Sequence, residues 1–183
     1  TWPAVVALYL IAPLVAELLS GSTPPRDWNN IGGVMLTVGL YGSGALLARE
    51  VVRARGLSWG NLALLGAAYG VLEEGVSYQS WFNPRWTPPP DAARAFAVNW
   101  TFATGFTSIH TALSILTSIV IAEALFPSVA TRPWLGRVGR IAFTVWLSLI
   151  VGVLFLSYGF SIYHGKGYDH PPVSYASAPT LFV

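Results

Sequence analysis

The adjacent carboxyl groups of Glu73 and Glu74 are the features of this chain that most directly suggest chemistry. They lie inside the apolar segment 62–78, which contains no Lys or Arg, and the whole sequence has only eight acidic residues. An ionisable group inside a membrane span is unfavourable and marks a functional site by default. Two neighbouring carboxyls cannot both ionise cheaply, and a carboxyl held near neutrality suits general acid–base work on water.

Two histidines and a third carboxyl are the candidates to join this pair. His110 lies midway along a later apolar segment, His164 follows the last one, and Glu17 lies near the end of the first. We expect these groups to converge in one half of a helix bundle. Because Glu and His are metal ligands, a divalent metal is one candidate cofactor. His110 is also a candidate ligand for a pigment such as haem or chlorophyll.

Helical spacing predicts which way these side chains point. Gly66, Gly70 and Glu74 follow one another at intervals of four, and small residues let a neighbouring helix approach closely. This spacing predicts that Glu74 faces the bundle rather than lipid. Polar residues also recur at helical spacing and form two stripes, each on one helix face. Such stripes either join helices or line a water-filled cavity. The first stripe is Thr107, His110, Ser114 and Thr117, and the second is Ser157, Ser161 and His164.

The composition places the chain in a bilayer. Hydrophobic residues make up 54% of the 183 residues and charged residues 10%, with a mean hydropathy of +0.55. Soluble domains carry about 25% charged residues. The absence of Cys excludes disulfides, thiolate metal sites and a cysteine nucleophile. We therefore predict an all-α, polytopic membrane protein that contacts the lipid bilayer and membrane protein partners.

Apolar runs close to the length of about 20 residues that a spanning helix needs predict about five transmembrane helices. Residues 1–163 form one bundle and residues 164–183 a tail outside the membrane. The first run lacks a basic region before it, so we expect a retained span. The loop of residues 81–95, which contains three consecutive prolines, is a candidate lid. The expected spans are about 3–20, 31–52, 57–80, 95–126 and 138–163.

The distribution of basic residues predicts the orientation. The loops after the second and fourth spans hold six arginines, against four basic residues on the other side. This favours the cytoplasmic (inner) membrane, with the N-terminus inside and the tail outside. The basic residues report orientation and do not indicate nucleic-acid binding. The six are Arg49, Arg53, Arg55, Arg132, Arg137 and Arg140, and the four are Arg26, Arg85, Arg94 and Lys166.

Two short motifs on consecutive spans resemble a known family. Residues 73–78 (EEGVSY) are similar to the EExxxR motif of the CPBP (CAAX protease and bacteriocin-processing, Abi) intramembrane endopeptidases, with Tyr78 in place of Arg. Residues 106–110 (FTSIH) match the FxxxH motif, and residues 164–168 (HGKGY) occupy the place of HxxxN or HxxxD.

The resemblance implies a membrane-embedded protease. Glu73 or Glu74 would then activate a water molecule, as a general base. His110 and His164 would hold that water or stabilise the oxyanion of a peptide carbonyl.

A non-catalytic role is the alternative. The glycine-rich second span, the Gly66–Gly70 step and the Pro- and aromatic-rich tail also suit a scaffold or accessory subunit of a larger membrane complex, in contact with pigment or lipid. Five spans without an inverted repeat argue against a self-contained transporter.

Overall fold

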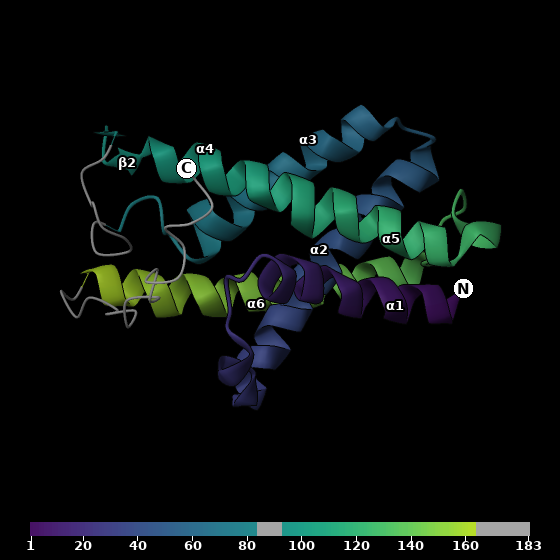
Figure 1. Cartoon of the computed structure of the whole chain (residues 1–183), viewed down its shortest axis with the longest axis horizontal. Helices are drawn as coiled ribbons and strands as arrows, with labels where there is room; N and C mark the ends of the chain where they lie inside the picture. The colour runs from purple at the N-terminus through teal and green to yellow at the C-terminus, as the bar shows by residue number, and fades with distance from the viewer. Residues whose placement is uncertain (84–92, 164–183) are drawn as a thin grey trace.

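The computed structural model describes residues 1–83 and 93–163, which fold as a bundle of helices with one small hairpin (Figure 1). The α-helices are α1 (Trp2–Pro13), α2 (Ile31–Arg55), α3 (Trp59–Gly70), α4 (Trp100–Ile109), α5 (Ser118–Leu125) and α6 (Arg137–Tyr163). Three π-helical segments continue α1, α3 and α4: η1 (Leu14–Leu19), η3 (Val71–Ser77) and η4 (His110–Thr117). Two short 3₁₀ turns are η2 (Pro25–Asn29) and η5 (Pro127–Val129), and the hairpin pairs β1 (Arg94–Ala95) with β2 (Val98–Asn99).

Side-chain caps explain where three of the helices begin. Asn30, Ser58 and Asn99 precede α2, α3 and α4, and each accepts a backbone N–H from the first turn of its helix. Such caps satisfy donors that a helix leaves unpaired at its start. Gly56 ends α2 with a φ of +62°, a left-handed conformation that glycine adopts without strain.

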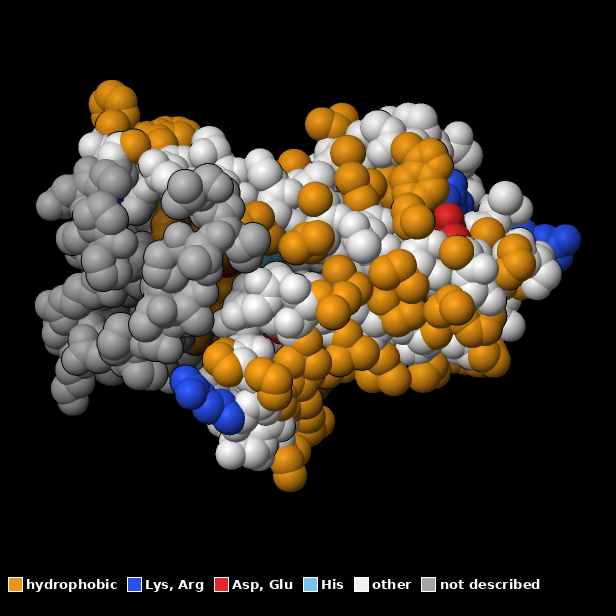
Figure 2. Space-filling model, viewed as in Figure 1, with side chains coloured by type: hydrophobic (Ala, Val, Ile, Leu, Met, Phe, Trp, Pro, Cys, Tyr) orange, Lys and Arg blue, Asp and Glu red, His pale blue; other side chains and the backbone are white. Residues whose placement is uncertain are grey.

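The all-α, polytopic fold is confirmed. Within the described residues, four helices are long and apolar enough to cross a membrane: Trp2–Leu19, Ile31–Arg55, Trp100–Leu125 and Arg137–Gly159. Apolar side chains cover much of the face shown in Figure 2. This agrees with a lipid-facing surface.

Two expected spans differ from the helices observed. The third, about 57–80, forms α3 and η3 over residues 59–77 but is not among the four helices that qualify by length and composition. Its two carboxyls and Asn61 lower its hydropathy. The fourth, about 95–126, begins with the hairpin, and its helix starts only at Trp100. The five-span topology and its boundaries remain predictions.

A buried ionic cluster joins the end of α2 to the segment between α5 and α6. Arg49 is fully buried; its guanidinium lies 3.2 Å from Glu50 and 2.9 Å from Glu123. It also donates to the carbonyl oxygens of Ala130, at 2.6 Å, and Arg132, at 3.2 Å. Because α2 extends to Arg55, Arg49 and Arg53 belong to a helix and not, as the sequence suggested, to a loop.

Glu50 completes this cluster from the other side. Its carboxylate accepts the backbone N–H groups of Trp134 at 2.7 Å and Leu135 at 3.0 Å. The Trp134 ring in turn lies 3.3 Å from the Arg49 guanidinium carbon, a cation–π contact. Arg53 binds Glu123 through two nitrogens, at 2.8 and 2.5 Å. The carboxylates here are paired with arginines, so the cluster fixes where α6 begins.

Substituting Glu50→Gln tests this anchor. The variant leaves the buried Arg49 charge short of a partner, so we expect a loss of about 3 kcal/mol in the free energy of unfolding. Thermal unfolding in detergent measures it, with the exposed Arg137→Gln as a control that leaves the melting temperature unchanged. An unchanged melting temperature for Glu50→Gln would contradict the assignment.

Candidate functional site

Each of the three π-helical segments carries a carboxyl or imidazole that the sequence singles out. Glu17 lies in η1, Glu73 and Glu74 in η3, and His110 begins η4. π-turns are rare in proteins and occur frequently at functional sites. The wider turns therefore mark the part of the bundle where function is expected.

Glu73, Glu74 and His110 form one buried cluster. The exposed fractions of the three residues are 0%, 6% and 5%. The imidazole lies between the carboxylates, with Nε2 3.1 Å from Oε1 of Glu74 and Nδ1 3.2 Å from Oε2 of Glu73. One ligand atom from each residue lies within 4.8 Å of the others. The predicted meeting of the Glu pair with the histidine of the next long helix is thus observed.

Two glycines bring the helices that carry these residues together. A Cβ atom added at Gly70 would lie 2.9 Å from the Cα of Thr107, and one added at Gly66 would lie 3.1 Å from the Cα of Thr111. A side chain at Gly70 would force the helices apart, and one at Gly66 would require its neighbour to shift. The prediction that the Gly66–Gly70 step turns Glu74 into the bundle is confirmed.

Serine hydroxyl groups contact two members of the cluster, one carboxylate oxygen of Glu74 and one ring nitrogen of His110. The Ser80 hydroxyl donates to Oε2 of Glu74, which leaves Oε1 facing the imidazole. The Ser114 hydroxyl lies 3.0 Å from Nδ1 of His110, as the polar stripe on this helix suggested. Aromatic rings enclose the imidazole, with centroids at 6.0 Å for Tyr41, 6.3 Å for Tyr69 and 6.2 Å for Phe106.

Glu73 is the member of the cluster whose carboxylate lacks hydrogen-bond donors among the described residues. Both of its carboxylate oxygens are buried and accept no hydrogen bond from the described residues, and the Tyr69 hydroxyl is buried in the same way. The approach to Nδ1 of His110 is thus an ion-pair contact without hydrogen-bond geometry. An unpaired buried polar group costs about 1–3 kcal/mol, so such groups need an explanation in terms of an ion, water or function.

Glu17 lies outside this three-residue set. Its carboxylate accepts hydrogen bonds from the hydroxyls of Tyr41 and Thr23, both at 2.5 Å. Tyr41 therefore links Glu17 to the ring stack around the imidazole. Ser157, from the second polar stripe, is exposed and donates to the carbonyl of Val153 at 2.7 Å. His164 and residues 84–92 of the candidate lid lie outside the described residues.

Sequence reasoning missed the two tyrosines. Tyr69 precedes Glu73 by four residues on one helix face, a spacing that could have identified it. Tyr41 comes from the middle of α2, and no motif in the sequence connects it to the site.

Substituting Gly70→Leu tests the role of the close helix approach. The new side chain pushes the end of α3 away from α4, and we expect a loss of about 1–3 kcal/mol in stability from overpacking. Gly105→Leu is the matched control on α4, because a Cβ there meets no atom within 4 Å. Thermal unfolding of both variants measures the effect, and equal melting temperatures would contradict the packing described.

Comparison with known proteins corrects the resemblance drawn from the short motifs. No curated protein and no solved structure matches the chain. A family model does match residues 6–183, and it is not that of the CPBP endopeptidases. The motifs at residues 73–78 and 106–110 fix only a few positions each, so their presence does not assign the chain to that family. Over nearly its whole length, the chain belongs to the family described as an uncharacterized membrane protein family.

Proposed function

We propose that Glu73, Glu74 and His110 bind a divalent metal ion and activate water there, so that the protein acts as a membrane-embedded hydrolase. The observation that carries the proposal is the convergence of three buried ligand groups, with atoms within 4.8 Å of one another. Carboxylate oxygen and imidazole nitrogen bind Zn²⁺ at about 2.0–2.2 Å, and catalytic zinc sites have three protein ligands and one open position.

The balance of charge supports the metal. A metal-bound imidazole is neutral. The two carboxylates then carry two negative charges, which one divalent cation neutralises. Within the described residues, the ion pairs of Glu73 and Glu74 go to His110. The carboxylates of the other buried cluster, by contrast, are paired with Arg49 and Arg53. Two carboxylates with one imidazole between them are costly to bury in a bilayer protein, and a bound divalent cation lowers that cost.

The surrounding hydroxyls support the same reading. Ligating histidines normally use one ring nitrogen for the metal and the other for an orienting hydrogen bond. Because Ser114 contacts Nδ1 of His110, Nε2 is the ring nitrogen left for the metal. Because Ser80 donates to Oε2 of Glu74, Oε1 is the carboxylate oxygen left for it.

Glu73 is the candidate general base. Its two carboxylate oxygens accept no other hydrogen bond among the described residues, so one is free to take a proton from water while the other binds the cation. The metal would supply Lewis-acid polarisation and lower the pKa of the bound water.

Metal content tests the binding step. Protein loaded with Zn²⁺ and dialysed is expected to retain about one ion per chain, and Glu74→Gln or His110→Ala is expected to lower zinc affinity at least tenfold, because each loses one of three ligands. Inductively coupled plasma mass spectrometry and calorimetric titration provide the readouts. Glu17→Gln is the control, since its carboxylate is held by Tyr41 and Thr23. Unchanged zinc binding in the double variant Glu74→Gln/His110→Ala would overturn the proposal.

Hydrolysis tests the second step. We expect the zinc-loaded protein in nanodiscs to hydrolyse a fluorogenic acyl ester or peptide amide, and a chelator to abolish the reaction. Glu73→Gln is expected to lower the rate at least a hundredfold, because the Gln amide oxygen can still face the ion but cannot take a proton from water. A rate that survives both chelation and Glu73→Gln would show that the cluster does not activate water.

We also propose that the arginine-bearing segments face the cytoplasm, in the inner membrane, with the N-terminus inside. Arg55, Arg132, Arg137 and Arg140 are exposed near helix ends, which supports this orientation. Because the chain has no Cys, Ser22→Cys and Ser128→Cys give single labelling sites at exposed positions. A membrane-impermeant maleimide added to intact spheroplasts should label the first variant and spare the second. The reverse pattern would contradict the orientation.

A further inference from the structure

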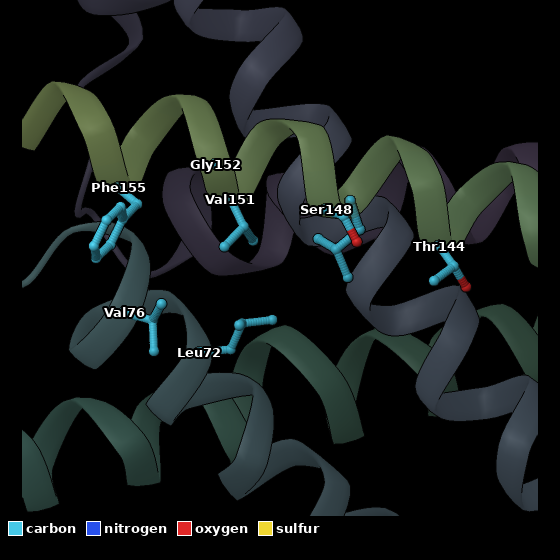
Figure 3. Close-up of a pocket in the computed structure, with 8 residues that line it drawn as sticks. Leu72, Val76, Thr144, Ser148, Val151, Gly152 and Phe155 are labelled. Carbon is cyan, nitrogen blue, oxygen red and sulfur yellow. The ribbon is translucent and has the colours of Figure 1, made fainter.

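Two adjoining pockets lie along one face of α6. The larger, of about 430 Å³, lies between α6 and η3 (Figure 3). It is lined by Leu72, Val76, Thr144, Leu147, Ser148, Val151, Gly152 and Phe155. The smaller, of about 320 Å³, lies between α6 and the end of α2, and is lined by Leu47, Glu50, Val51, Ala54, Arg55, Arg140 and Thr144.

The two pockets adjoin along α6, and together they are called the groove. Thr144 lines both, and Arg140, Thr144, Ser148, Val151 and Phe155 recur at helical spacing on a single face of α6. From Arg140 to Phe155 the helix rises about 22 Å, at 1.5 Å per residue. The hydrocarbon of one leaflet is about 15 Å thick, half of the bilayer core. The groove is therefore long enough for a headgroup and an extended acyl chain.

The arginine-bearing end of the groove is positively charged. Arg55 is the last residue of α2 and Arg140 lies in the first turn of α6, so both lie where a span meets the interface. Arg55 makes no ion pair within the described residues, and Arg140 donates only to the carbonyl of Leu135, at 3.3 Å. Glu50 also lines this end.

The charge of Glu50 does not offset the two arginines. Its carboxylate is bonded to Arg49 and to the backbone of Trp134 and Leu135. Two guanidinium groups at the interface therefore remain available to an anion.

The rest of the groove is apolar. Leu72 and Val76 project from η3 toward Val151 and Phe155 of α6 (Figure 3). The Thr144 hydroxyl donates to the carbonyl of Arg140 at 2.8 Å and so offers its methyl group to the groove. A molecule that matches this surface has an anionic head and a hydrocarbon chain.

We propose that the groove binds one anionic phospholipid, with its phosphate between Arg55 and Arg140 and an acyl chain along α6 toward Phe155. Basic pockets between membrane helices on the cytoplasmic side are the known setting for anionic lipid headgroups. The apolar body and the charged end together distinguish this site from ordinary lipid contact. The proposal does not depend on metal binding or hydrolysis at the Glu–His cluster.

Native mass spectrometry of protein released from nanodiscs tests the proposal. The nanodiscs contain equal amounts of phosphatidylcholine and phosphatidylglycerol, and we expect one phosphatidylglycerol to remain bound to the wild type. Arg55→Gln/Arg140→Gln is expected to lower that occupancy at least fivefold. Arg132→Gln, which removes an exposed arginine outside the groove, is the matched control and should retain the lipid.

Filling the groove gives a second, independent variant. A Cβ at Gly152 meets no atom within 4 Å, so Gly152→Leu should fold normally while its side chain occupies the space for the acyl chain. We expect the same fivefold loss of phosphatidylglycerol with an unchanged melting temperature. Wild-type occupancy in both the arginine and glycine variants would overturn the proposal. So would a wild-type dimer without bound lipid that Gly152→Leu converts to monomer, since a second copy would then cover the groove.

Discussion

The burial of carboxylate charge is the constraint on which this structure depends. Four glutamates are buried in the bundle, and they form two clusters that meet the same desolvation penalty in opposite ways. Glu50 and Glu123 are paired with arginines, and Glu50 also accepts two backbone N–H groups, so this cluster is satisfied and serves to hold segments together. Glu73 and Glu74 share a single imidazole. Two carboxyl groups that share one basic partner have the composition of a site that binds a cation or moves a proton.

The backbone is arranged to make that second cluster possible. Gly66 and Gly70 allow the two helices to approach closely enough for η3 and the start of η4 to face each other. Glu73 and Glu74 lie in the π-helical segment η3 and His110 begins η4, and both carboxylates reach the imidazole from these wider turns. Local backbone irregularity and close packing therefore act together.

The sequence predicted the helical class and the inward direction of Glu74, because both follow from local spacing and composition. It also placed His110 on the facing helix. Tyr41 could not be predicted, since its contact with Glu17 depends on how two helices cross. The arginines show the same limit: Arg49 and Arg55 look equivalent in the sequence, but one is buried in an ion cluster and the other exposed at the membrane interface.

The family resemblance was wrong for a related reason. Two motifs with few fixed positions describe a chemical cluster, and they do not identify the fold that carries it.

The two surfaces of η3 connect the cluster to the membrane. Leu72 and Val76 line the groove along α6, while Glu73 and Glu74 between them point into the bundle. A single turn therefore separates hydrocarbon from the polar site. On the groove side, the Gln79 amide donates to the carbonyl of Phe155 in α6 at 3.1 Å. Lipid packed in the groove would complete the wall behind η3, since van der Waals contact, rather than water exclusion, holds helices together within a bilayer.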